Sequence, residues 1–182
     1  ETALVDSISK ALKKSRVDPK RIRGIGLDGT SCTVVFLDSS GRALREAVIW
    51  MDIRAAREAE EVAATGDPAL DYVGHGNVSP EWFPCKTAWV KRHEPEVYAA
   101  SRTVFELTDW LAFRLTGERT VNIDTATIRW FYNSRRGGWP LSLYRKMGLE
   151  DLFEKVPGRI VKIGEAVGGL SAEMARATGL PA

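Results

Sequence analysis

Three short clusters in the sequence combine residue types that recognise polar small molecules. The first is Gly24–Cys32, where glycines at positions 24, 26 and 29 permit close approach of another strand or of a ligand. The hydroxyls of Thr30 and Ser31 and the thiol of Cys32 follow. The segment has no Gly-Lys-Ser/Thr and leads into a strand, so it is not a phosphate loop at a helix N-terminus. A tight corner between strands and a ligand site both fit it.

The second cluster lies where an expected strand gives way to an expected helix. It contains Trp50, Asp52 and Arg54. Ligand sites in α/β proteins gather at such strand ends. An indole offers an apolar platform, and a carboxylate with a guanidinium can bind hydroxyl groups. A structural role fits equally well, because Asp52 suits the N-cap of the next helix and Arg54 suits an ion pair.

The third cluster is Asn77–Lys86, in which two prolines stiffen the entry into a helix. Glu81, Trp82 and Lys86 lie within six residues of one another. A lysine buried beside a cleft is a good partner for a hydroxyl or a phosphate. A solvated lysine on the first turn of a surface helix is the alternative.

Other candidates for chemistry are weaker. His75 and His93 are far apart and have no partners at metal-ligand spacing, which argues against zinc. Cys32 and Cys85 fit either a redox pair or two packed thiols. Arg135–Arg136 lies among aromatic residues as in some nucleic-acid binders, but a helix and turn with core aromatics explains it better.

Composition limits the classes of protein. Of 182 residues, 44% are apolar and 27% charged, which is typical of a globular domain and excludes intrinsic disorder. The 26 basic and 24 acidic residues give a net charge of +2, which argues against nucleic acid as a partner. No apolar run reaches the roughly 20 residues of a membrane span, so no membrane partner is expected. Two cysteines are too few for a disulfide scaffold, so we expect a cytoplasmic location.

The expected class is α/β, with a small sheet followed by a helical section. In the first part we predict a helix over 3–16, strands over 21–27, 33–37 and 43–50, and a helix over 52–64. The turn at 38–41 joins the last two strands as a hairpin. The three strands in quick succession predict antiparallel pairing.

After a long loop over 65–82, the pattern is mostly helical. We predict helices over 83–93, 95–101, 108–116 and 172–178, and a short strand over 103–106. Gly117 and Gly179 suit helix C-termini and Ser171 suits an N-cap. Asn122 or Asp124 is expected to cap a helix through residue 130, and Pro140 to occupy the first position of another. The chain starts inside a helical pattern without an initiator Met, so we expect a piece of a longer protein.

The order of these segments resembles that of the FGGY carbohydrate kinases. The similarity lies in Gly26–Cys32, in the strand ending at Asp38 with its turn at Gly41, in Val48–Ala55, and in Ser79–Lys86, where Pro80 precedes Lys86 by six residues; it continues through Phe105–Gly117, Asn122–Ala126 and Gly164–Ser171. Each segment is short, but together they keep the family's order over almost the whole chain. Thr30–Cys32 and Ser79–Trp82 most resemble ribulokinases, and Ile49–Arg54 resembles the D-ribulokinase-like branch.

The resemblance implies an RNase H-like, actin-like ATPase domain. The family has two domains, with sugar in a cleft on the first and ATP-Mg bound mainly through the second. Residues 1–182 are then a single partial domain, truncated at both ends. The opening Asp-x-Gly-Thr strand is expected before Glu1, since Asp28-Gly29-Thr30 matches it in letters but not in order. The catalytic Asp is expected after Ala182, so the fragment alone is expected to be inactive and to bind no cofactor or metal.

The resemblance also implies an ATP-dependent kinase that phosphorylates a hydroxyl of a pentulose such as ribulose, or of a related polyol. The substrate-binding residues it implies are Thr30, Ser31 and Cys32 on one side, Trp50 as an apolar wall, Asp52 and Arg54 at the floor, and Glu81 and Lys86 against sugar oxygens. The expected partner is a small sugar, and the sequence leaves the oligomeric state, including a homodimer, open. The alternative is a non-catalytic sugar-binding or regulatory protein on the same fold.

Overall fold

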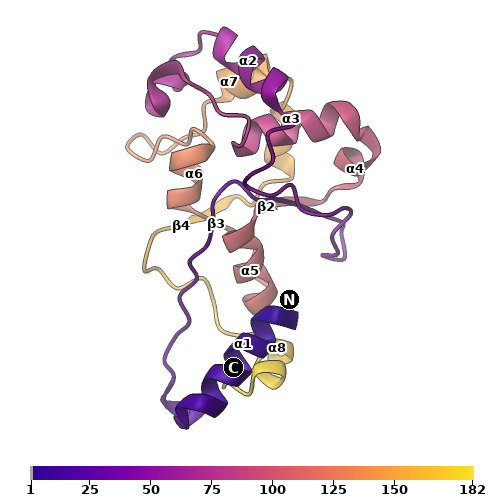
Figure 1. Cartoon of the computed structure of the whole chain (residues 1–182). Coiled ribbons are helices and arrows are strands. Elements are labelled where there is room, and N and C mark those ends of the chain that lie inside the picture. The colour runs from indigo at the N-terminus through magenta and orange to yellow at the C-terminus, as the bar shows by residue number, and fades with distance from the viewer. Residues whose placement is uncertain (1) are drawn as a thin grey trace.

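Two short sheets lie at the middle of the molecule, in a computed structural model that describes residues 2–182 (Figure 1). Strand β1 (Val34–Leu37) pairs antiparallel with β2 (Thr103–Glu106). Strand β3 (Thr120–Asn122) pairs parallel with β4 (Arg159–Val161). All residues of β1 and β2 are buried, as in strands that are covered on both faces. The strands predicted over 33–37 and 103–106 are therefore confirmed.

The predicted hairpin forms only in part. Asp38 accepts the backbone N–H groups of Ser40 and Arg42, and Gly41 takes a φ of 79°, so the turn at 38–41 is confirmed. The returning chain meets β1 only at isolated bridges from residues 43 and 48. A continuous strand over 43–50 is wrong, because these few bridges leave the residues between them without ladder pairing.

The N-terminal segment departs further from expectation. Helix α1 (Thr2–Ser15) is confirmed, but a short 3-10 helix (Pro19–Arg21) follows it and residues 22–30 form no strand. That segment is extended and mostly exposed, and within residues 2–182 no strand pairs with it. The predicted strand over 21–27 is therefore wrong for this structure, since an extended segment needs a partner to become a strand.

The chain from 56 to 100 is mainly helical. Helix α2 (Ala56–Ala64) starts four residues later than predicted, and its N-cap is Ala55 rather than Asp52. Two 3-10 helices (Pro68–Tyr72 and Gly74–Gly76) lie in the predicted long loop. Helices α3 (Phe83–His93) and α4 (Pro95–Ala100) confirm the helices predicted there.

The remaining helices have the predicted signals at their ends. Helix α5 (Leu107–Thr116) ends at Gly117 with φ 81°, and Asn122 caps α6 (Ile123–Arg129). Helix α7 (Leu141–Lys146) has Pro140 at its N-cap, one position earlier than expected, and a 3-10 helix (Glu150–Glu154) follows. Helix α8 (Ala172–Thr178) lies between Ser171 and Gly179 as predicted. The expected mixed α/β class is confirmed.

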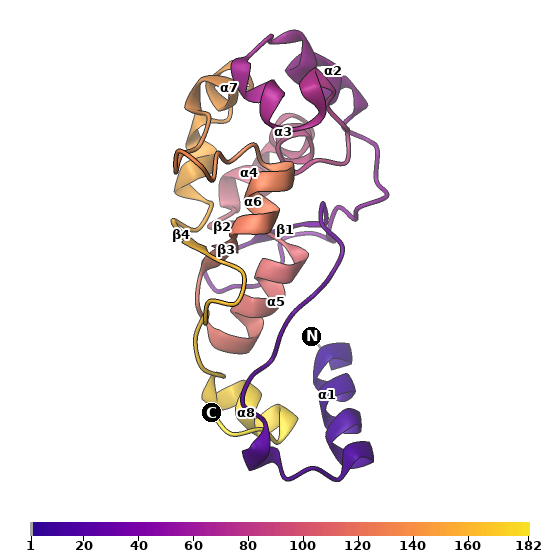
Figure 2. The same cartoon turned by 90° about the vertical axis from the view of Figure 1, so that its left-hand side faces the viewer.

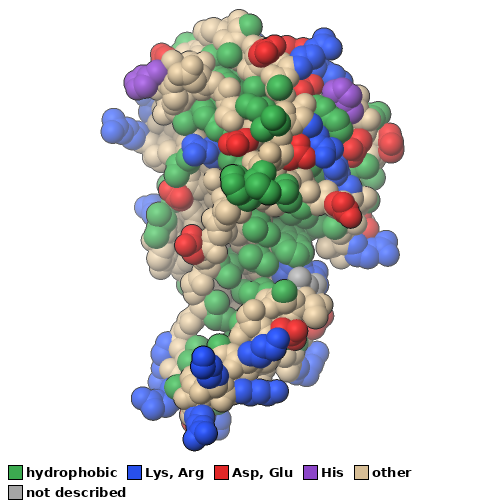
Figure 3. Space-filling model, in the orientation of Figure 1, with side chains coloured by type: hydrophobic (Ala, Val, Ile, Leu, Met, Phe, Trp, Pro, Cys, Tyr) green, Lys and Arg blue, Asp and Glu red, His purple; other side chains and the backbone are tan. Residues whose placement is uncertain are grey.

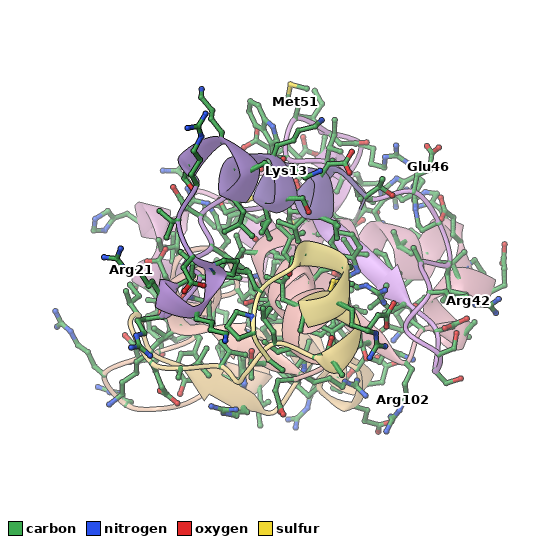
Figure 4. The ribbon with its side chains drawn as sticks, turned by 90° about the horizontal axis from the view of Figure 1, so that it is seen from below. Lys13, Arg21, Arg42, Glu46, Met51 and Arg102 are labelled. Atoms are coloured by element: carbon green, nitrogen blue, oxygen red, sulfur yellow. The ribbon has the colours of Figure 1, made fainter. Side chains whose placement is uncertain are left out.

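Helices α1 and α8 contact each other at the end opposite α2 and α7 (Figure 2). Lys and Arg side chains gather over this end (Figure 3), and Arg21 points outward when it is viewed from below (Figure 4). The buried core lies at the other side of the sheets. It includes the ring of Phe83 stacked on Trp130, with centroids 3.6 Å apart. A second apolar cluster contains Cys32, Cys85 and Phe131.

Candidate functional site

Lys86 is the point at which the three sequence clusters meet. It lies in the first turns of α3 and its side chain is 0% exposed. Its ammonium donates to the carbonyl oxygens of Cys32 and Ile49, each at 2.7 Å. These bonds join the end of the first cluster to the residue before Trp50. The alternative of a solvated surface lysine is therefore wrong.

The charge of Lys86 is held among acidic groups. Burial lowers the pKa of Lys86, while the nearby carboxylates of Asp52, Glu106 and Glu81 oppose that change. A buried ammonium is stable only where oxygens surround it. The site therefore has a positive centre with an acidic surround, which suits binding of hydroxyl and carbonyl oxygens rather than of a free cation.

Cys32 has an unusual backbone. Its φ is 68°, in the left-handed region that a non-glycine residue rarely adopts, and its side chain is buried. Its N–H donates to Glu106 Oε2 at 2.7 Å. Thr30 and Ser31, immediately before it, are exposed, and the Cys32 thiol lies 3.7 Å from Ser31 Oγ. The corner interpretation and the ligand interpretation of this segment are thus compatible, because a fixed corner presents the two hydroxyls.

The two cysteines behave as packed thiols. Both are free and buried in one apolar cluster. Burial raises the pKa of Cys32 and raises that of Cys85 to about 12. Thiols with raised pKa values are poor nucleophiles, so the redox-pair alternative is disfavoured.

The second cluster has one exposed platform and one ion pair. Trp50 is 46% exposed, and its backbone N–H donates to Thr33 Oγ1 at 3.1 Å. Asp52 does not cap α2. It binds Arg54 instead, with Arg54 Nη2 and Asp52 Oδ2 2.7 Å apart, and the hydrogen bonds from Arg54 lower the pKa of Asp52. The guanidinium of Arg54 also lies over the ring of Trp89, 4.7 Å from its centroid. Met51 lies beside them, 57% exposed, and points outward (Figure 4).

Glu81 lies at the entry to α3 and is only weakly tied. Its N–H donates to Ser79 Oγ at 3.3 Å, and its Oε2 lies 3.5 Å from the same hydroxyl. The next residue, Trp82, packs edge-on against Phe131 with ring centroids 5.4 Å apart. The chain around Glu81 is thus anchored while its carboxylate keeps capacity to accept further hydrogen bonds.

Sequence reasoning missed Glu106. It ends β2, is 1% exposed, and accepts both the Cys32 N–H and the Trp130 Nε1–H, each at 2.7 Å. Burial raises its pKa to about 7, although both hydrogen bonds favour the ionised form. The available signal was a carboxylate closing an otherwise apolar strand directly before a helix.

A separate cleft of about 890 Å³ lies between residues 20–27, α5 and the loop at 161–170. None of the eight residues predicted to bind substrate lines it. Among residues 2–182, no group of three or more His, Cys, Asp or Glu side chains is placed to hold a metal ion. No helix of the described chain is long and apolar enough to cross a membrane.

Comparison with known proteins finds relatives over almost the whole chain. The chain is 35% identical to an FGGY carbohydrate kinase domain-containing protein of Xenopus laevis over 179 residues, which is 90% of this chain and 32% of that protein. It is 33% identical to a ribulokinase of Bacillus licheniformis over 197 residues, which is 97% of this chain and 35% of that protein. The chain therefore spans about a third of the length of these relatives.

Solved structures have the same fold. A structure described as a xyloylose kinase from Brucella ovis matches with a TM-score of 0.78 at 32% identity, over 98% of this chain and 35% of that one. A gluconate kinase from Lactobacillus acidophilus matches with a TM-score of 0.83 over 99% of this chain and 36% of that one; at 18% identity it supports the fold alone. The family model for the N-terminal domain of FGGY carbohydrate kinases matches residues 2–182, so the chain belongs to that family.

Proposed function

We propose that this chain is the sugar-binding part of an ATP-dependent carbohydrate kinase whose substrate is a ketopentose or a related polyol. The observation that carries the proposal is the pair of bonds from Lys86 to the carbonyls of Cys32 and Ile49, because they bring three separate clusters to one place. Similarity to ribulokinases supports the ketopentose as the first substrate to test.

Each predicted residue then has a role in binding. The exposed indole of Trp50 is the apolar wall, and the hydroxyls of Thr30 and Ser31 face the sugar from the corner that Cys32 ends. Glu81 accepts hydrogen bonds from sugar hydroxyls. Asp52 and Arg54 hold the connection that leads from Trp50 into α2. Such a set of polar groups around one apolar surface is what a small polyol requires.

Lys86 has a further donor for the sugar. An ammonium carries three N–H groups, and two of them meet backbone carbonyls here. We assign the third to a sugar oxygen. Its positive charge also favours the sugar hydroxyl in the orientation that phosphoryl transfer needs.

In this proposal residues 1–182 are part of one domain, and the catalytic base lies in chain beyond Ala182. ATP supplies the phosphoryl group and Mg²⁺ neutralises its developing charge. Both are assigned to residues outside this chain. The residues described here bind and orient the hydroxyl that accepts the phosphoryl group. We also propose a cytoplasmic location, where two free thiols remain reduced.

The test is a substrate panel on the full-length protein. ADP release is measured with ATP-Mg and D-ribulose, L-ribulose, D-xylulose, ribitol, erythritol or glycerol. We expect release above background with at least one ketopentose. Calorimetric sugar binding without ADP release would favour the non-catalytic alternative, and neither binding nor release with any compound would overturn the proposal.

A further inference from the structure

Two charged side chains bind the backbone N–H and C=O groups of Cys32, an arrangement called here the Cys32 grip. Its N–H donates to the carboxylate of Glu106, and its carbonyl oxygen accepts from the ammonium of Lys86. Both bonds are 2.7 Å long, as expected for charge-assisted hydrogen bonds. The two side chains come from different elements, β2 and α3, so they fix Cys32 relative to both.

The Cys32 grip acts on a residue whose backbone is strained. Cys32 has a left-handed φ of 68°, which side chains other than glycine disfavour. Such a conformation persists only where the surroundings determine it. The apolar packing of the Cys32 side chain cannot set the direction of its N–H and C=O groups, whereas the two charged partners do.

The same set of bonds extends to the platform residue. Lys86 also binds the carbonyl of Ile49, and Thr33, which follows Cys32, accepts the N–H of Trp50. The positions of Ser31 and Trp50 are thus linked through Cys32. Glu106 anchors this linkage to the core through its second oxygen, which accepts the indole N–H of Trp130.

We propose that Glu106 is a positioning residue of the sugar site, holding Cys32 in its left-handed conformation so that Ser31 and Trp50 face one ligand. The inference rests on the proposed function. Both carboxylate oxygens of Glu106 are occupied inside the protein, one by the Cys32 N–H and the other by the Trp130 indole N–H, so Glu106 acts through the backbone rather than by binding the sugar.

The test compares two isosteric variants of the full-length protein. Glu106→Gln keeps the shape but leaves one acceptor for two N–H donors. Tyr144→Phe is the matched control, because the Tyr144 hydroxyl donates to the carbonyl of Trp130 at 2.8 Å and is equally buried, yet does not touch Cys32. Hydrogen–deuterium exchange at the Cys32 amide reports whether its bond to Glu106 is kept. Steady-state kinetics give the KM for the sugar and the KM for ATP.

At pH 8, where the Glu106 carboxyl is ionised, we expect exchange at Cys32 and the sugar KM to rise about tenfold or more in Glu106→Gln, the effect of one lost charge-assisted bond. The ATP KM should stay within about twofold, and Tyr144→Phe should change neither quantity. Glu106→Asp, which keeps two acceptors, should recover part of the loss.

Unchanged exchange at Cys32 in Glu106→Gln would overturn the claim that Glu106 holds the Cys32 backbone. Faster exchange with an unchanged sugar KM would overturn the positioning role and leave the proposed function intact. If no sugar supports ADP release by the unmodified protein, the proposed function and the positioning role both fail, while exchange still decides whether Glu106 grips Cys32.

Discussion

The ammonium of Lys86 lies 2.7 Å from the carbonyl oxygen of Cys32, although the two residues are 54 positions apart in the chain. Lys86 belongs to α3 and Cys32 immediately precedes the buried segment that becomes β1. This contact turns a stretch of glycines and hydroxyls into part of a site, because it brings the stretch to the same place as the entry to α3.

Replacement of Lys86 by Met should separate sugar binding from ATP binding. The apolar stem is retained while the ammonium and its bonds to the carbonyls of Cys32 and Ile49 are lost. We expect the sugar KM to rise about tenfold to a hundredfold and the ATP KM to change less than about threefold. Steady-state kinetics of the full-length enzyme measure both.

Lys91 supplies the control for this substitution. It lies on the same helix and its ammonium also donates to a backbone carbonyl, that of Gly148, at 2.7 Å. Its other partners are Asp151 and the ring of Tyr98, neither of which belongs to the candidate site. Lys91→Met should leave the sugar KM within about twofold. Equal effects of the two substitutions would count against a specific role for Lys86.

The ionisation of Glu106 should make stability depend on pH. Burial raises its pKa in the folded protein to about 7, above the ordinary carboxyl value of 4.5. Between these two values the folded state holds the proton more tightly than the unfolded state, so this group's contribution to stability falls as pH rises from 4.5 to 7. Lys86, Arg129, Asp109, Cys32 and Tyr144 are the other titratable groups that interact with it.

Glu106→Gln isolates this contribution. The difference in unfolding free energy between the unmodified protein and the variant should move by about 2–4 kcal/mol over that interval. Urea unfolding of both proteins at pH 5, 6, 7 and 8 measures it. A difference that is constant with pH would mean that Glu106 keeps an ordinary pKa.

Asp52 and Arg54 should contribute little to stability despite their close contact. Their pair is 2.7 Å long but partly exposed, with 38% of the Arg54 side chain accessible. Water screens such pairs, so a double-mutant cycle of Asp52→Asn and Arg54→Gln should give a coupling energy of about 0.2–1 kcal/mol. A coupling above about 2 kcal/mol would contradict this prediction and show that the pair is essential for stability.

Local signals predicted helices better than they predicted strands. The ends of α8 follow from Ser171 and Gly179, because a side-chain cap and a left-handed glycine act within one turn. The segment 21–27 has strand composition but pairs with nothing within the described residues, since a strand depends on a partner elsewhere in the chain. The start of α2 was misplaced for a different, local reason: Asp52 binds Arg54, two residues further on, instead of capping the helix.

The candidate site shows the same division. The family's motif order selected Cys32, Trp50 and Lys86 from the sequence, but spacing alone does not reveal that an ammonium would bind two backbone carbonyls. Glu106 was missed because its partners are a backbone N–H 74 residues away and an indole on α6's C-terminal side. Contacts between distant segments are set by packing, which local patterns do not encode.

The stack of Phe83 on Trp130 should support both the core and the site. The rings lie 3.6 Å apart at 12°, Phe83 is fully buried, and Trp130 is the residue whose indole N–H binds Glu106. Phe83→Ala leaves a cavity beside that indole and should cost about 3–5 kcal/mol of stability. Ile163→Ala, at a side chain that is 76% exposed, should stay within about 0.5 kcal/mol. Denaturant unfolding of the full-length protein compares the two. Loss below about 1 kcal/mol for Phe83→Ala would mean that the core closes over the vacancy and that the stack does not hold Trp130 in place.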